Sequence, residues 1–333
     1  MDERFIIRSR RVVQLGPMQV DIRSNEERFA GMRYFSRTGD APATARAHYT
    51  LSLCNLNVDG PWPLQRLMEE RDRTYRGKRF AAGYYITDHF GAPAYLITRG
   101  THYWIFAHDF EPVLWPYVVK LLLTVCAMEH GMVHLKAAGI AVAGRGTLLV
   151  GRGGSGKTVL LTKLCQAGAQ FLSNTHALIE GETMLALPSA MRVRADALFG
   201  PLIAARKLPP SVKPGEYLAD PLLDMGWQWS ATAPLRNICL VDYRGAGRHD
   251  VHEIDRDVLF EYVDQFSLAL NVYGLKEDVF DYLAGDVGAF ATHVSGMKDR
   301  LRAMIGRCRG YYVSSDVMEP RNLAAILRLL AGE

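Results

Sequence analysis

Residues 148–158 read Leu-Leu-Val-Gly-Arg-Gly-Gly-Ser-Gly-Lys-Thr and fit the pattern G-x-x-x-x-G-K-[ST] without a mismatch. The run follows an apolar, strand-like segment and leads into the helix-like segment Val159–Gln166, which is the context that a phosphate-binding loop requires. The alternative, a glycine-rich turn that happens to carry a lysine, does not explain why strand, loop and helix occur together. The stretch therefore predicts that the chain binds a nucleoside triphosphate.

Each part of this loop has an expected role toward the nucleotide. Glycines let backbone N–H groups point inward around a phosphate, and the following helix directs its positive end to the same charge. Lys157 would reach the β- and γ-phosphates, and the Thr158 hydroxyl would bind Mg²⁺. The predicted cofactors are ATP and Mg²⁺, and the predicted nucleotide-binding residues are Gly151, Gly153, Gly154, Ser155, Gly156, Lys157 and Thr158.

Composition narrows the class of protein further. The 333 residues are 49% apolar and 22% charged, which is ordinary for a globular chain long enough for two domains. The net charge of +4 is spread along the chain rather than gathered in a basic stripe, so we expect no nucleic-acid partner.

The termini, apolar stretches and cysteines bear on the compartment. The charged N-terminus lacks the apolar core of a signal peptide, and the apolar stretch Val113–Met128 carries Lys120 and is short for a membrane span. The five cysteines have no C-x-x-C spacing and are typical of thiols in a reducing compartment; they are Cys54, Cys126, Cys165, Cys239 and Cys308. These features predict a cytoplasmic protein without a membrane partner.

Two domains are expected. Residues 1–130 are rich in short β-like runs and end in a helix that opens at Glu111-Pro112. In residues 131–333, strands and helices interleave, which predicts an α/β domain, and its hairpins make a purely parallel sheet unexpected. The expected hairpin turn is Gly144-Arg145-Gly146, and one amphipathic helix is expected near Asp257–Leu270.

A family resemblance rests on the segments around the loop. Leu-Lys-Ala-Ala-Gly-Ile-Ala-Val-Ala-Gly-Arg-Gly at 135–146 leads into the loop, and Gly-Ala-Gln-Phe-Leu-Ser-Asn-Thr-His-Ala-Leu-Ile at 168–179 follows its helix. This layout resembles the HPr serine kinase/phosphorylase family, which has a P-loop-containing mixed-sheet kinase core of the phosphoenolpyruvate-carboxykinase type. The resemblance covers residues 131–195, returns more weakly at 234–242 and 310–330, and leaves the N-terminal third uncovered.

The sequence departs from that family at three positions. Lys136 stands where most relatives have histidine, and Asn174 and Thr175 stand where they have two aspartates. In the family those aspartates serve the metal ion and the base that activates the acceptor hydroxyl. An amide and a hydroxyl cannot take a proton at neutral pH, although the Asn174 carbonyl oxygen can serve Mg²⁺ or its water shell.

The departures leave three hypotheses open. A proton acceptor can come from elsewhere, with His176 nearest and His134 second, unless His176 is a surface-loop residue or strand alternation turns His134 into the core. The acceptor can instead be a carboxylate that needs no deprotonation, or the chain can bind nucleotide without transferring phosphate. Lys136 adds a second cation near the expected γ-phosphate, which suits phosphoryl transfer or an anionic acceptor.

Three further features are candidates for the site. Arg192 and Arg194 have period-two spacing, so both guanidinium groups lie on one face of an extended segment. That face either binds a phosphate or carboxylate group or is simply solvated. Asp242 ends an apolar strand and is either a Mg²⁺ ligand or the cap of a turn. The Pro/Gly-rich stretch 206–215 is either a substrate loop or a surface excursion.

The leading hypothesis is an ATP- and Mg²⁺-dependent phosphotransferase that acts on a hydroxyl of a peptide or small molecule. Lys157, Lys136, His176 and Asn174 are its expected catalytic residues, Thr158, Asn174 and Asp242 its metal ligands, and Arg192, Arg194 and His134 its substrate contacts. The alternatives are a carboxylate-activating, amide-forming ligase that works through an acyl phosphate, and a non-catalytic nucleotide-binding regulatory module. Assembly into a homo-oligomer is left open.

Overall fold

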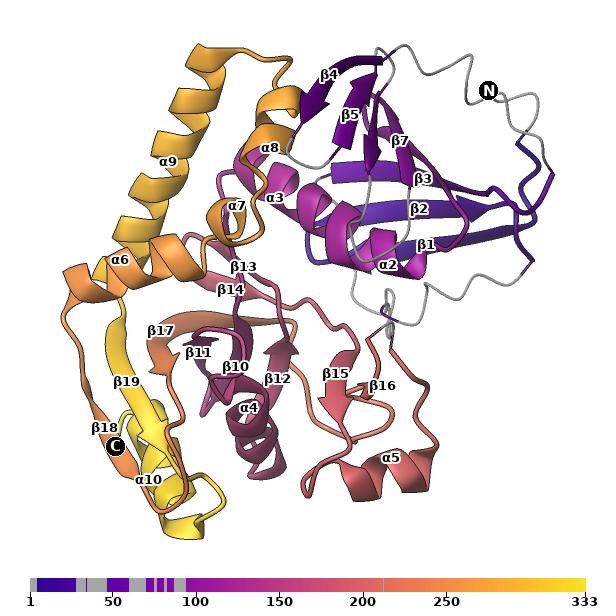
Figure 1. Ribbon diagram of the computed structural model, residues 1–333. Coiled ribbons are helices and arrows are strands. Elements are labelled where there is room, and N and C mark those ends of the chain that lie inside the picture. The colour runs from indigo at the N-terminus through magenta and orange to yellow at the C-terminus, as the bar shows by residue number, and fades with distance from the viewer. Residues whose placement is uncertain are drawn as a thin grey trace. The chain divides into compact units, whose positions relative to one another are not determined.

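The computed structural model describes residues 5–27, 34, 47–59, 70–74, 77–80, 83–86, 94–211 and 213–333. The chain divides into two compact units, Met1–Leu123 and Thr124–Glu333. The architecture is mixed α/β, as Figure 1 shows for the individual elements. The expected boundary stood at residue 130, and the division lies before Thr124, inside the helix that ends at Glu129.

The first unit is built on one mixed sheet in the order β1-β2-β3-β8-β7-β6-β5-β4. Strands β2, β3 and β8 run parallel to one another, and the remaining neighbours are antiparallel. The strands are β1 (Ser9–Leu15), β2 (Met18–Ser24), β3 (Ala47–Asn55), β4 (Glu70–Thr74), β5 (Gly77–Phe80), β6 (Gly83–Ile86), β7 (Ala94–Arg99) and β8 (His102–Ala107).

A continuous helical stretch follows this sheet. It comprises α2 (Glu111–Val113), a π-helical turn η3 (Leu114–Val119) and α3 (Lys120–Glu129), and it opens at the acid-proline pair as the sequence predicts. Within the described ranges it is the one helix long and apolar enough to cross a membrane by length and composition. Its most apolar window is 89% buried inside the protein, as in the core helix of a folded domain.

The second unit contains a nine-stranded mixed sheet. Its centre is the parallel set β11-β17-β19, and β10, β12 and β18 add to that set antiparallel. The first residues of β17 pair with β14, which continues the sheet through β13 to β9. The strands are β9 (Val133–Leu135), β10 (Ala138–Val142), β11 (Arg145–Val150), β12 (Gln170–Ser173), β13 (Ala177–Glu180), β14 (Thr183–Leu185), β17 (Thr232–Val241), β18 (His249–Glu253) and β19 (Arg309–Ser315).

Helices cover both faces of this sheet. Strand alternation sends Leu149 to one face and Leu148 to the other, and two separate hydrophobic clusters form there. The first cluster contains α4 and α10, and the second contains α6 and α9. The helices are α4 (Lys157–Gln166), α5 (Gly200–Arg206), α6 (Arg256–Phe266), α7 (Ala269–Val272), α8 (Lys276–Tyr282), α9 (Val287–Gly306) and α10 (Pro320–Ala331). A separate two-stranded antiparallel sheet is formed by β15 (Met191–Arg194) and β16 (Glu216–Ala219).

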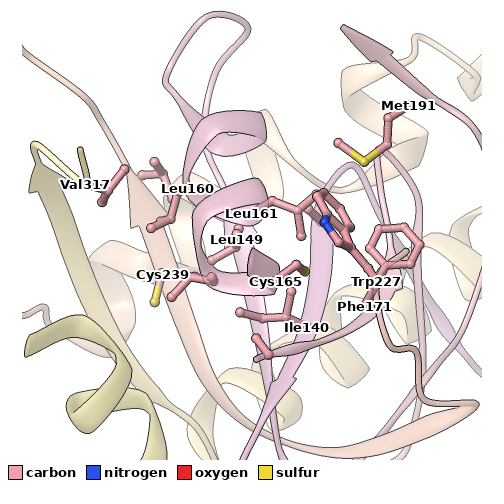
Figure 2. Packing of buried hydrophobic residues seen from close by; sticks show 14 of the residues in the cluster. Ile140, Leu149, Leu160, Leu161, Cys165, Phe171, Met191, Trp227, Cys239 and Val317 are labelled. Atoms are coloured by element: carbon pink, nitrogen blue, oxygen red, sulfur yellow. The ribbon is translucent and has the colours of Figure 1, made fainter. Parts of the chain in front are cut away.

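Buried leucines anchor α4 on the sheet. Leu160 and Leu161 are at most 3% exposed and pack with Leu149 and Ile140 (Figure 2). Full burial of each such side chain contributes about 1.5–3 kcal/mol. Because α4 begins directly after the glycine-rich loop, this packing also holds the loop in place.

Two sequence predictions within this unit were wrong in detail. The β10–β11 turn lies at Ala143 and Gly144, both with positive φ (48° and 73°), so β11 starts at Arg145. A two-residue hairpin of this kind matches the right-handed twist of its strands. The helix expected near 257–270 ends at Phe266, because Leu268 leaves it to form a β-bridge with Leu135.

Candidate functional site

The glycine-rich loop connects β11 to α4 and approaches its neighbours closely at two glycines. Gly151 has φ 152°, and a Cβ there would lie 2.5 Å from the Val241 carbonyl oxygen. Gly156 has φ 89° and caps α4, and a Cβ there would lie 2.9 Å from Tyr243 Cβ. These positions require glycine because a side chain would meet both backbone strain and a steric clash. The loop thus lies against the end of β17, and the residues that follow it at the start of α4 are half-buried.

Lys157 folds back over this loop. Its ammonium donates to the carbonyl oxygens of Gly151 (2.6 Å) and Arg152 (2.7 Å) and to Ser155 Oγ (3.3 Å). Burial, followed by the charge of Lys136, lowers the pKa of Lys157 from 10.5 to about 8. The lysine is therefore a partly desolvated cation that the bound phosphates of a nucleotide would stabilise.

The parallel strands bring a second segment to the loop. The backbone N–H of Tyr243 donates to the Ser155 carbonyl oxygen at 3.0 Å, so the residues after β17 are bonded to the loop. Asp242, which ends β17, receives hydrogen bonds from Arg244 (2.8 Å) and Tyr312 (3.0 Å) at Oδ2. Burial alone would raise the pKa of Asp242, but these two hydrogen bonds outweigh it and lower the pKa. Asp242 is thus a carboxylate at the loop, held by an arginine and a tyrosine.

Sheet register brings the residues that depart from the family pattern to the same edge. Ala138 pairs with Leu149, and Lys136, two residues before Ala138, is near enough for its charge to lower the pKa of Lys157. Gly139 pairs with Ser173, so Asn174 follows next to Ala138. The candidate residues on both sides of the loop in sequence therefore meet at the carboxyl end of β11.

Three cations act on one another at this edge. The charge of Lys136 lowers the pKa of Lys157, and after burial the charge of Arg192 lowers the pKa of Lys136. Burial raises the pKa of Tyr273, and the charge of Arg192 opposes that rise. Mutual repulsion of this kind is costly in the free protein and is relieved when an anion binds among the charges. The arrangement is chemically suited to a polyanionic ligand.

His134 and His176 form a buried pair beside these cations. They are 3% and 1% exposed, and His134 Nε2 lies 3.1 Å from His176 Nδ1. The pair continues to Thr124 Oγ1, which is 2.9 Å from His134 Nδ1, and to the Tyr273 hydroxyl, which is 3.4 Å from His176 Nδ1. His176 is therefore no surface-loop residue, and His134 faces the core. Imidazole and phenol groups in such a row can pass a proton along it.

The backbone between Asn174 and His176 is strained. Thr175 has φ 70°, and the His176 N–H donates to the Asn174 carbonyl oxygen at 2.8 Å, which closes a three-residue γ-turn of the rarer, positive-φ kind. Such a conformation at a β-branched residue costs about 1–3 kcal/mol and persists where the surroundings impose it. The Tyr273 hydroxyl donates to the Thr175 carbonyl oxygen at 3.1 Å and so holds the turn.

Arg192 and Arg194 lie on the exposed face of β15, as their period-two spacing predicts. Both pair with Glu216 on the neighbouring strand, Arg194 at 3.1 Å and Arg192 at 3.7 Å. Burial alone would raise the pKa of Glu216, but the hydrogen bond from Arg194 and the surrounding cations lower it. Arg192 is the member of the pair that also acts on Lys136.

The described residues of the stretch 206–215 join neighbouring elements of the second unit. Arg206 ends α5, Leu208 is 6% exposed within the first hydrophobic cluster, and Pro210 forms a β-bridge with Tyr217. Val212 lies outside the described residues.

Sequence reasoning missed three contributors to the site. Tyr273 follows α7, Tyr312 lies in β19, and Glu216 lies in β16, each far along the chain from the residue it contacts. No local pattern marks them, because their contacts arise from strand pairing and chain reversal. Tyr273, which joins the histidine pair to the cations, is the most consequential omission.

The residues available to Mg²⁺ are oxygen donors. Thr158, Asn174 and Asp242 offer a hydroxyl, an amide carbonyl and a carboxylate, the ligand types that Mg²⁺ prefers. Among the described residues there is no group of three or more His, Cys, Asp or Glu side chains placed to hold a metal ion. This donor set fits an ion held chiefly by the phosphates of a nucleotide.

The chain matches no protein-family model, and no curated protein is significantly similar to it. The resemblance described above therefore rests on the residues around the loop alone.

Proposed function

We propose that the chain is an ATP- and Mg²⁺-dependent phosphotransferase with a P-loop kinase core of the HPr-kinase type, acting on a hydroxyl of a peptide or small molecule. The observation that carries the proposal is the loop itself. Gly151 and Gly156 lie at positions that admit no side chain, and Lys157 spans the loop at the N-terminus of an anchored helix. Both features suit phosphate binding.

The cations define where the transferred phosphoryl group would lie. Lys157 would contact the β- and γ-phosphates, and Lys136, whose charge acts on Lys157, would stabilise charge on the group in transit. When bound, Mg²⁺ supplies further neutralisation of the phosphate charge, with Thr158, Asn174 and Asp242 as its protein ligands.

The histidine pair supplies the proton acceptor that residues 174 and 175 lack. The acceptor oxygen would bond to the γ-phosphorus, the bond from that phosphorus to the bridging oxygen would break, and ADP would leave. The Tyr273 hydroxyl lies 3.4 Å from His176 Nδ1 and donates to the Thr175 carbonyl oxygen in the free protein. To relay the acceptor's proton, Tyr273 would turn its own proton from Thr175 to His176 Nδ1 as it takes up the proton of the acceptor hydroxyl. His134, in contact with His176, would stabilise the charged imidazole by sharing its proton.

A second function is favoured by the group Lys136, Lys157 and Arg192. Their mutual repulsion would be relieved by an anionic acceptor, and a carboxylate needs no base to attack ATP. The product would be an acyl phosphate, and the enzyme a carboxylate-activating ligase. The third candidate is a regulatory module that binds nucleotide without turnover.

Labelled ATP with Mg²⁺ and a panel of hydroxyl- and carboxyl-bearing acceptors separates these functions. A kinase yields ADP and a phosphate ester that hydroxylamine leaves intact. A ligase yields an acyl phosphate that hydroxylamine converts to a hydroxamate with release of phosphate. Binding without turnover indicates the regulatory module.

Two variants and a control sharpen the result. Lys157→Ala should abolish nucleotide binding, whereas Lys163→Ala, at the other end of α4, should preserve it. His176→Gln should lower kcat at least tenfold and shift its pH profile while nucleotide affinity stays within about twofold. Unchanged nucleotide affinity in Lys157→Ala would refute the proposal as a whole.

A further inference from the structure

A cavity of about 240 Å³ opens beside the first turn of α4. Gly156 and Val159 line it, so it begins where the phosphate loop ends. Its volume is below the roughly 300–1,000 Å³ of sites that enclose a whole drug-sized ligand. It therefore has room for one part of a nucleotide, the part farthest from the phosphates.

The walls of this cavity are apolar. Leu160, Val241 and Val313 come from α4 and the ends of two parallel strands, and Val317 follows β19. These residues are at most 6% exposed, so they form a rigid floor already packed against the core. A flat, weakly hydrated ring is the kind of ligand that such a floor accepts.

Two large side chains on the rim remain exposed. Tyr243 is 46% exposed and Met318 is 54% exposed, although both line the cavity. Tyr243 is also fixed in position, because its backbone N–H is bonded to Ser155 in the loop. Tyrosine faces and methionine sulfur both contact aromatic rings favourably. The rim thus offers two surfaces between which a ring would lose its exposure to water.

Two carboxylates line the cavity, and both accept hydrogen bonds from backbone N–H groups. Asp316 accepts the N–H groups of Gly247 and Met318, and Asp196 accepts those of Leu198 and Phe199 through Oδ1. The lining residues, all within the described part of the chain, include no Lys, Arg or His. The amino group of adenine is a donor that such acceptors can bind.

We propose that this cavity binds the adenine ring of the nucleotide, with Tyr243 and Met318 on its two faces. The proposal rests on the proposed nucleotide function, and it adds a base-binding site to the phosphate-binding loop. A larger cavity of about 450 Å³ lies near the other end of α4, lined by Cys165, Gln166 and Trp227. It shares no residue with the phosphate loop, so the smaller cavity is the one that a base tethered to the phosphates would reach.

Calorimetric titration of the full chain with three probes tests this site. The probes are the β,γ-imido analogues of ATP and GTP and inorganic tripolyphosphate, each with Mg²⁺. The variants are Tyr243→Ala, Tyr243→Trp and Lys157→Ala. Leu223→Ala is the control, because Leu223 is an exposed apolar residue (61%) that does not line the cavity.

The expected result is a loss that depends on the base. Tyr243→Ala should weaken binding of the ATP analogue about tenfold, the scale of a lost base–aromatic stack, and leave tripolyphosphate affinity within twofold. Tyr243→Trp should restore the affinity, and Leu223→Ala should leave it unchanged. The GTP analogue should bind more weakly than the ATP analogue.

Each of the other outcomes overturns one part of the proposal. If Tyr243→Ala weakens both probes equally or neither, the base does not lie against Tyr243, although a requirement for Lys157 would still support nucleotide binding. If the GTP analogue binds as tightly as the ATP analogue, the assignment of adenine is wrong. If the unaltered chain binds no probe, this inference and the proposed function fail together.

Discussion

Replacing Lys136 with methionine should change the pH at which the protein loses affinity for nucleotide. Burial, followed by the charge of Lys136, holds the pKa of Lys157 at about 8 in the free protein. A phosphate beside the ammonium raises that pKa, because an opposite charge stabilises the protonated form. Binding above pH 8 therefore takes up a proton, and affinity is full below pH 8 and falls as the pH rises.

The size of the fall follows from the fraction of Lys157 that is charged. With a pKa of about 8, about nine in ten molecules carry the charge at pH 7 and about one in ten at pH 9. Affinity should therefore fall about tenfold between these pH values, or about 1.4 kcal/mol. The terminal phosphate contributes little to this change, because its own pKa lies near 6.

Lys136→Met removes the second cause of the lowered pKa and leaves the first. The midpoint of the affinity loss should then move to higher pH. A midpoint at pH 9, for example, would reduce the loss between pH 7 and pH 9 to about twofold. Affinity at pH 7 should also fall, since a cation near Lys157 is gone. The midpoint pH reports the change in the pKa of Lys157 separately from this overall loss of affinity.

The assay is titration of the β,γ-imido analogue of ATP at half-unit intervals from pH 7 to pH 10. Lys163→Met, at the other end of α4, is the control and should keep the midpoint of the unaltered protein. The reasoning would be refuted by an affinity that is flat across the range, or by a midpoint that stays in place or moves down in Lys136→Met.

Three substitutions test the site and its support by thermal and urea denaturation. Gly151→Ala should destabilise the protein by about 2 kcal/mol or more and abolish nucleotide binding, because its Cβ would lie 2.5 Å from the Val241 oxygen; Gly306→Ala, outside the loop and with no atom within 4 Å of its Cβ, should do neither. Thr175→Gly should raise the midpoint temperature, since it relieves about 1 kcal/mol or more of strain, and a lower midpoint would show that the φ of 70° is not strained. Leu161→Ala should cost about 2–5 kcal/mol, and a cost below about 1 kcal/mol would mean that α4 is not anchored as described.

The local features of the second unit could be read from the sequence. The glycines and lysine at 151–157 predict a phosphate-binding loop. The strand before the loop and the helix after it lie where the pattern predicts them. The helix starts at Glu111 and Pro320 also follow from local signals, an acid and a proline in the first turn. The errors are at element ends, as at Phe266, where pairing between Leu268 and Leu135 outweighs helical periodicity.

Other elements left no signal strong enough to be predicted. β18, α5 and α8 were not foreseen. β18 exists because β19 offers it a partner across five residue pairs, and its exposed residues alone do not define a strand. The partners of β17 are likewise set by strand order, which no single segment contains.

By itself, the sequence determined that a glycine-rich loop with Lys157 connects a strand to a helix, because these local signals lie within one short segment, and it predicts phosphate binding there. It also determined that residues 174 and 175 carry no carboxylate. Only the tertiary structure decided that His176 is buried against His134, 42 positions away, and that Tyr273 joins them to the cations around Lys136. Proximity between such distant positions is set by strand register and chain reversal, and the pKa of Lys157 is set by the burial and charges that this proximity creates.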